Sequence, residues 1–177
     1  MSVFLFISGV HAVLWFAGKS TAPPEHIYRL ETLDQETFAH GPPIVLATDY
    51  PLPVDHVDVV SSLTFGHGIP QDAKIAEIVL EDMDGRHYRA SMRAGIHTAE
   101  QSSYRPEHKG QLRHDTRRTR VVRHLISNDN SDAYYDLLLF HYEWKLPRPL
   151  FVKNIRIQYT YPFGRFYLAD IFLRSTP

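Results

Sequence analysis

Short runs in which apolar and polar residues alternate, separated by turn residues, fill the sequence from about residue 26 onward. The clearest is Ile75–Glu81, where Ile78 and Leu80 share one face, and it is followed by Arg86–Met92. A period of two is typical of β-strands, because successive side chains point to opposite faces of a sheet. Asp84-Gly85 lies between the two runs, and both residues tolerate the positive φ of a tight turn. The pattern predicts an antiparallel β-hairpin.

Six more stretches read as strands, and one short acidic stretch, Glu31–Phe38, reads as a helix. Pro162-Phe163-Gly164 predicts a second hairpin, between the last two strands. So many short strands indicate a mostly β protein, an antiparallel β-sandwich or jelly roll. The six strands are predicted at Ile44–Thr48, Val54–Phe65, Thr119–Ile126, Tyr134–Leu146, Phe151–Tyr161 and Arg165–Arg174.

The N-terminal stretch Met1–Gly18 has a different character, since it carries no formally charged side chain and thirteen of its residues are apolar. As a helix it would reach about 27 Å, slightly less than a hydrocarbon core of about 30 Å. The alternatives are a cleaved signal peptide, which would normally begin with positive charge, and a buried soluble helix, which would normally carry a charged face. We therefore expect one membrane-inserted helix at residues 1–19, a linker or edge segment at 20–53, and a β-sandwich domain at 54–177.

The few polar residues of the N-terminal stretch share one helical stripe, formed by Ser8, His11, Trp15 and Gly18. Small and hydrogen-bonding residues let membrane helices approach one another, so this stripe is a candidate face for a partner helix. Neutral imidazole is also a common axial ligand, so His11 could contact a tetrapyrrole held by a partner subunit. The simpler alternative is a neutral histidine hydrogen-bonded to a neighbouring backbone.

Charge is divided between two parts of the chain, although the net charge is only -1. Residues 19–60 carry a net charge of -5 and residues 101–125 carry +5. The basic stretch could meet anionic lipid headgroups or an acidic partner, or it could be a solvated loop and edge strand. The near-zero net charge argues against a nucleic-acid partner. The basic residues are Arg105, Lys109, Arg113, Arg117, Arg118, Arg120 and Arg123.

The residues that could carry chemistry do not form a catalytic motif. There is no cysteine, no Gly-x-Ser-x-Gly, no glycine-rich phosphate loop and no His-Glu-x-x-His, so we expect a protein that is not an enzyme. Asp82 and Asp84 are weak candidates for Ca²⁺, and the hairpin turn explains both equally well. A metal site from the histidines is also weak, and hydrogen bonding is the simpler reading; it would use His97, Glu100, His108 and His114.

Loop and hairpin signatures between Val54 and the C-terminus are similar to those of a known module. They are Ile69-Pro70, Ala76–Leu80, Asp82–Arg86, Arg93–Gly95, Thr98–Glu100, Tyr104–Pro106 and Tyr161–Gly164. This part of the chain resembles a galactose-binding-like β-sandwich module found at the ends of bacterial integral membrane proteins of the glycosyltransferase or mannosyltransferase type. His97 and Gln101 stand where that pattern has an acidic residue and a tryptophan, which weakens the inference of a stacked sugar.

Two functions remain open. The first is a non-catalytic, membrane-anchored accessory subunit that docks on and stabilises a larger bacterial membrane complex, such as a photosynthetic or respiratory assembly. We place it in the inner membrane as a single pass with a periplasmic body, although Lys19 and Arg29 favour the opposite orientation. The alternative is a carbohydrate-binding module of the cell envelope, presenting aromatic residues such as Tyr104, Tyr134, Tyr135 and Trp144.

Overall fold

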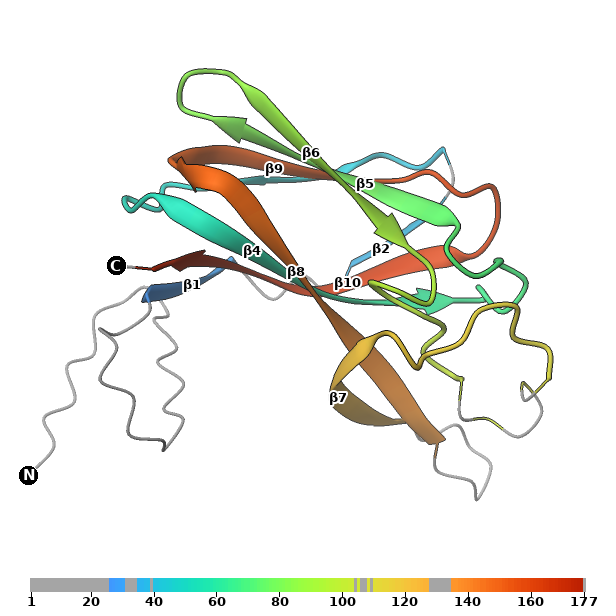
Figure 1. Cartoon of the computed structure of the whole chain (residues 1–177). Helices are drawn as coiled ribbons and strands as arrows, with labels where there is room; N and C mark the ends of the chain where they lie inside the picture. The colour runs from blue at the N-terminus through green and yellow to red at the C-terminus, as the bar shows by residue number, and fades with distance from the viewer. Residues whose placement is uncertain are drawn as a thin grey trace, which may run out of the picture.

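Two antiparallel β-sheets packed face to face form the body of the protein (Figure 1). The computed structural model describes residues 26–30, 35–38, 40–103, 105, 108, 110–127 and 135–176. The strands are β1 (His26–Leu30), β2 (Gln35–Phe38), β3 (Ile44–Ala47), β4 (Val54–Thr64), β5 (Lys74–Asp82), β6 (His87–Arg93), β7 (Arg120–Ser127), β8 (Tyr135–Leu150), β9 (Val152–Tyr159) and β10 (Arg165–Ser175).

The larger sheet has the order β1-β10-β4-β8-β7, and β2 pairs with the first residues of β10 on the same side as β1. The smaller sheet has the order β3-β9-β5-β6. The chain passes from the larger to the smaller sheet at Phe151, between β8 and β9, and returns through the turn between β9 and β10. The fold is therefore a β-sandwich, as the sequence predicts.

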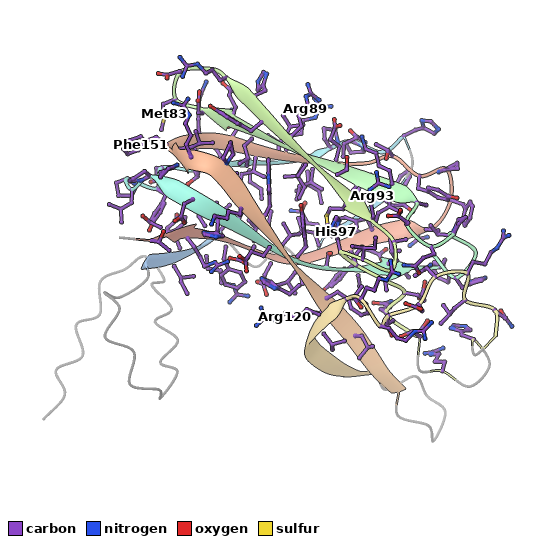
Figure 2. The ribbon with its side chains drawn as sticks, in the orientation of Figure 1. Met83, Arg89, Arg93, His97, Arg120 and Phe151 are labelled. Carbon is purple, nitrogen blue, oxygen red and sulfur yellow. The ribbon has the colours of Figure 1, made fainter. Side chains whose placement is uncertain are left out.

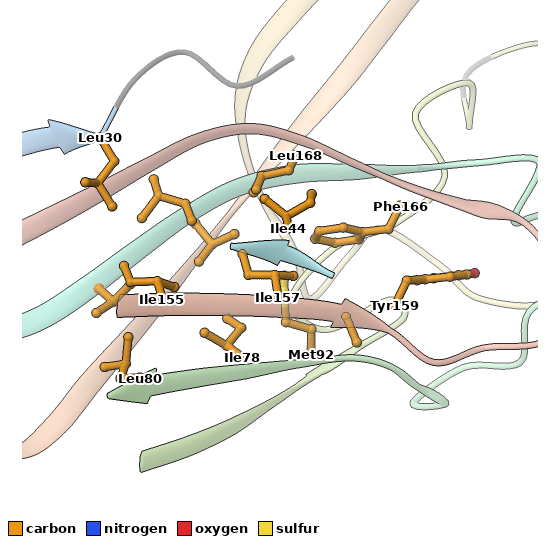
Figure 3. Close-up of a cluster of buried hydrophobic side chains, with 14 of the residues drawn as sticks. Leu30, Ile44, Ile78, Leu80, Met92, Ile155, Ile157, Tyr159, Phe166 and Leu168 are labelled. Atoms are coloured by element: carbon orange, nitrogen blue, oxygen red, sulfur yellow. The ribbon is translucent and has the colours of Figure 1, made fainter. Parts of the chain in front are cut away.

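The core lies between the two sheets and is filled by alternate residues of the central strands (Figure 3). Ile78 of β5 and Ile157 of β9 are fully buried and lie opposite each other in the smaller sheet. Tyr159 stacks on Phe166 of the larger sheet with 6.3 Å between ring centroids. Burial of each such side chain contributes about 1.5–3 kcal/mol, so this alternation holds the sheets together.

The strand register defines two ends of the sandwich. At one end, which we call the His26 end, His26 pairs with Ser175, and Val54 pairs with Leu150. At the other, the Arg165 end, the first residue of β10 pairs with Phe38 on one side and Thr64 on the other. β10 runs the whole way between the two ends.

The predicted strands agree with the structure, because all eight correspond to β3 through β10. The hairpin prediction at Asp84-Gly85 is also confirmed, since Glu81 pairs with His87 and Gly85 has a φ of 77°. The range 20–53, expected to be a linker or edge segment, contributes three strands. β1 and β2 pair with β10, and β3 pairs with β9 at the edge of the smaller sheet.

Two local predictions are wrong. Pro162-Phe163-Gly164 does not close a hairpin, because β9 belongs to the smaller sheet and β10 to the larger one. The turn instead connects the two sheets at the Arg165 end, and there the hydroxyl of Tyr159 donates to the backbone oxygen of Phe163 at 2.6 Å. The second error concerns Glu31–Phe38, because Gln35–Phe38 forms β2 rather than a helix. Pairing with β10 supplies its backbone hydrogen bonds and decides its conformation.

The expected membrane helix, with Ser8, His11, Trp15 and Gly18, lies outside the described residues. Within the part of the chain that the structure describes, no helix is both long enough and apolar enough to cross a bilayer.

Candidate functional site

Three exposed phenylalanines gather at the Arg165 end. Phe38, Phe65 and Phe163 are between 44% and 63% exposed, although they come from segments far apart in the sequence. The strand register brings them together, because Arg165 lies between Phe38 and Thr64, and Phe163 precedes it by two residues. Exposed apolar side chains that cluster in this way mark a binding surface more often than isolated ones do. We call these three residues the aromatic patch.

Phe65 is held outward by an unusual backbone conformation. Its φ is 58°, in the left-handed region that bulky side chains rarely adopt. The guanidinium of Arg165 lies 5.5 Å from the centre of its ring. Residues in such conformations persist where the surrounding structure holds them, and they concentrate at functional positions.

A buried polar network supports the loops beneath the aromatic patch. The carboxylate of Glu100 is almost fully buried; its Oε2 accepts a hydrogen bond from the Gly66 amide at 2.6 Å and its Oε1 accepts one from the Ser102 hydroxyl at 2.8 Å. His108 Nδ1 lies 2.9 Å from the same hydroxyl. In a hydrolase triad the serine would give its proton to the histidine, whereas here the buried hydroxyl donates to the carboxylate. The arrangement therefore braces the loops.

His114 joins the segment 110–119 to the same loops. This buried histidine lies with Nδ1 2.8 Å from the backbone oxygen of Ile69, and its Nε2 accepts from the Glu100 amide at 3.1 Å. These partners require the neutral tautomer that carries its proton on Nδ1. The Arg113 amide donates to the backbone oxygen of His67 at 2.8 Å, so the basic segment is fixed next to the aromatic patch.

His97 lies outside the hydrogen-bonded network of Glu100. Its ring stacks on Tyr142 with centroids 4.1 Å apart, and its Nδ1 accepts from the Arg93 amide at 3.1 Å. Burial lowers the pKa of His97, so the imidazole is neutral at pH 7. Of the four metal candidates, Glu100, His108 and His114 thus belong to one hydrogen-bonded network, and His97 does not. Among the described residues, no group of three acidic, histidine or cysteine side chains is arranged to hold a metal ion.

The arginines of the basic stretch differ in their pairing. Arg117 pairs with Asp115 at 2.6 Å and Arg105 is half-buried. Arg113, Arg118 and Arg120 are exposed and form no ion pair among the described residues, although the charge of Arg118 helps to lower the pKa of Asp115. Elsewhere on the surface Arg86, Arg89, Arg93 and Arg165 each pair with a carboxylate. Lys109 lies outside the described residues, and Arg123 is described only as part of the backbone of β7. Exposed guanidinium groups without an ion pair to another described residue therefore collect at Arg113, Arg118 and Arg120 of segment 113–120.

An open pocket of about 370 Å³ lies beside Arg113, and Gln71, Ser103 and Thr116 are among its lining residues. Gln71 is already engaged, because its side chain bonds to Gly95 and Asp115. The buried hydroxyl of Ser103 has no hydrogen-bond partner within the described part of the chain.

The weak calcium candidates serve the β5–β6 turn instead. Asp82 Oδ1 accepts hydrogen bonds from the amides of Asp84 and Arg86 at 3.0 and 2.8 Å, and Tyr88 donates to Oδ2 at 3.3 Å. Burial raises the pKa of Asp82, but the hydrogen bonds outweigh burial and hold this pKa below its usual range. Asp84 is exposed and pairs with Arg86. The two carboxylates therefore have structural partners in the hairpin.

A buried ion network on the outer face of the larger sheet is a feature that the sequence pattern does not indicate. Asp58 is 4% exposed; it accepts a hydrogen bond from His141 Nε2 at 2.5 Å and pairs with Arg174, which also contacts Glu143 at 3.0 Å. Burial raises the pKa of Asp58, yet the hydrogen bonds from His141 and Arg174 bring it below the usual value. The three strands β4, β8 and β10 are thus linked by charge as well as by backbone pairing.

The proposed sugar-stacking residues are only partly described. Trp144 is half-buried and packs against the core, and of Tyr135 only the backbone is described. Tyr104 and Tyr134 lie outside the described residues.

Comparisons of this chain with protein-family models, curated proteins and solved structures find no match. The β-sandwich is therefore the level at which the fold is shown, and the galactose-binding-like assignment stays a prediction. The functional argument rests on the residues of the Arg165 end.

Proposed function

We propose that this chain is a non-catalytic accessory subunit that docks through its Arg165 end on an acidic surface of a larger bacterial membrane complex. The observation that supports this best is the aromatic patch next to Arg113, Arg118 and Arg120, which are exposed and form no ion pair within the described part of the chain. Aromatic residues and arginine are enriched at protein interfaces and supply most of their binding energy.

The energetics favour an interface at this end. Full burial of an exposed phenylalanine contributes about 1.5–3 kcal/mol. The three side chains of the aromatic patch are 44–63% exposed, so each can still contribute about half of that against a partner. The rigid loops reduce the ordering cost of association, because Glu100 and His114 already fix the segments that present Phe65 and Arg113. Opposite charge on the partner would speed association and select the correct surface.

The rest of the proposal concerns attachment to the membrane. Residues 1–18 would anchor the body as a single pass in the inner membrane, with the body on the periplasmic side. The stripe of Ser8, His11, Trp15 and Gly18 would meet a helix of the partner, and His11 could there contact a tetrapyrrole. A photosynthetic or respiratory assembly is the setting that we propose for such a subunit.

Co-purification in a gentle detergent tests this function. We expect the full-length chain to migrate with larger membrane subunits in fixed ratio, and we expect F163S or R113E to lose them. The matched controls F151S and R89E change an exposed phenylalanine and an exposed arginine away from the Arg165 end, and should retain the partner.

A wild-type chain that is monodisperse and free of partners would contradict the proposal, as would full retention of the partner by both F163S and R113E. Binding of the purified chain to immobilised polysaccharide, lost in W144A, would support the carbohydrate-binding alternative instead.

A further inference from the structure

A second pair of exposed apolar side chains lies at the His26 end. Met83 is 58% exposed and Phe151 is 50% exposed, and the amide of Met83 donates to the backbone oxygen of Phe151 at 3.0 Å. Figure 2 shows the two side chains close together, at the opposite end from the loops of the Arg165 end. We call this pair the apolar tip.

The backbone fixes the outward position of the apolar tip. Phe151 lies between Leu150 and Val152, which are both buried, and an alternating backbone then directs Phe151 away from the core. Met83 follows Asp82, whose carboxylate holds the β5–β6 turn through the Asp84 and Arg86 amides. Both side chains are therefore presented by ordered segments.

The chain enters the sandwich at this same end. β1 begins with His26, which pairs with Ser175, and Leu150 pairs with Val54 at the same end of the larger sheet. Only residues 19–25 separate β1 from the uncharged stretch Met1–Gly18. Seven extended residues span at most about 25 Å, so a bilayer that holds the stretch lies within that reach of His26.

Three cationic residues lie within three positions of Met83 or Phe151 along the chain. Lys153 pairs with Glu81 at 2.8 Å, Arg86 pairs with Asp84 at 3.2 Å, and Arg148 donates to the hydroxyl of Tyr88 at 2.9 Å. All three have partners, in contrast to the exposed arginines of segment 113–120 that form no ion pair within the described part of the chain. Exposed apolar side chains close to long cationic ones match the boundary between acyl chains and headgroups.

From these observations we infer that the apolar tip rests in the bilayer interface beside the membrane segment. The inference rests on the membrane attachment in the proposed function and adds the orientation of the body. β10 has eleven residues, and at about 3.3 Å each it spans about 36 Å. An upright sandwich would thus hold the aromatic patch about 36 Å from the tip, where only the extramembrane part of a complex can reach it.

Single-cysteine labelling of the full-length chain tests the inference cleanly, because the sequence has no cysteine. The variants S8C, F151C and F163C each carry one polarity-sensitive fluorophore, in vesicles of phosphatidylcholine and phosphatidylglycerol. We expect blue-shifted emission and several-fold protection from a water-soluble quencher at positions 8 and 151. Position 163 is the matched control and should emit as in water.

Each other outcome has a distinct meaning. If position 8 is protected and position 151 emits as in water, the apolar tip does not touch the bilayer and this inference fails, while the anchor stands. If position 8 also emits as in water, the membrane attachment fails and the inference fails with it. Protection of position 163 together with 151 would mean that the body lies along the membrane, which overturns the upright orientation.

Discussion

Replacement of Asp58 by alanine tests whether charge pairing holds the outer face of the larger sheet together. The carboxylate lies among β4, β8 and β10 and accepts hydrogen bonds from His141 and Arg174. D58A removes both sets of hydrogen bonds and leaves His141 and Arg174 without their shared carboxylate partner. The backbone pairing of the three strands is unchanged.

The size of the effect follows from burial. Loss of one partner of a buried ion pair costs about 3–5 kcal/mol, because the other charge remains unpaired in a poorly solvated site. Arg174 is 18% exposed and keeps Glu143 at 3.0 Å, so we expect the lower end of this range, about 3 kcal/mol. At about 2–4 °C per kcal/mol for a chain of this size, the Tm should fall by about 6–12 °C.

Urea unfolding of D58A and E143Q, in the detergent that keeps the chain soluble, measures this cost. Glu143 is 44% exposed, so E143Q should cost less than about 1 kcal/mol. The folded-state pKa of Asp58 is lowered, so its stabilisation is present above the usual aspartate pKa of about 4 and is lost as the pH falls through the lower folded value. Equal costs for the two variants, or a D58A difference that does not shrink in acid, would refute the reasoning.

Three further predictions concern single residues. Burial lowers the folded-state pKa of His97, so stability should fall as the pH decreases below about 6.5, and H97Q should flatten this slope in unfolding curves recorded against pH. G95A should destabilise the body by about 1–2 kcal/mol, because Gly95 has a φ of 71° and a Cβ there would lie 2.3 Å from the side-chain oxygen of Gln71. The same oxygen accepts the hydrogen bond of the Asp115 amide, so hydrogen exchange of that amide should become faster. F65N should leave the free energy of unfolding within about 1 kcal/mol of wild type, since asparagine tolerates positive φ, while partner binding weakens.

Alternation was enough to locate most of the sandwich. In β5 the buried residues Ala76, Ile78 and Leu80 recur every second position, as do Ile155, Ile157 and Tyr159 in β9, and this period is visible in the sequence. Asp84-Gly85 supplies its own turn chemistry, so that hairpin was predictable from local residues alone.

The errors arise where tertiary pairing decides local structure. Gln35–Phe38 has no alternating apolar run, and it becomes a strand because the first residues of β10 offer a free edge. Pro162-Phe163-Gly164 has the composition of a hairpin turn, but the choice between pairing and crossing depends on which sheet each strand joins. Neither decision is encoded within the few residues concerned.

The candidate site was only half predictable. The basic stretch is evident from composition, but the aromatic patch is not. Phe38 ends β2, Phe65 directly follows β4 and Phe163 lies between β9 and β10, so the three have no common spacing. Their proximity depends on Arg165 lying between β2 and β4. The sequence signal that could have suggested them is a lone phenylalanine in a turn or at the strand end beside it.

Cross-linking from the aromatic patch in native membranes tests the central claim most directly. A photoreactive group attached to F163C should form a covalent adduct with one polypeptide of a larger membrane complex. The same group at M83C, on the apolar tip, should give no such adduct, because we assign that end to lipid. If position 163 yields no adduct, or if both positions capture the same polypeptide equally, the Arg165 end is not the docking surface of an accessory subunit.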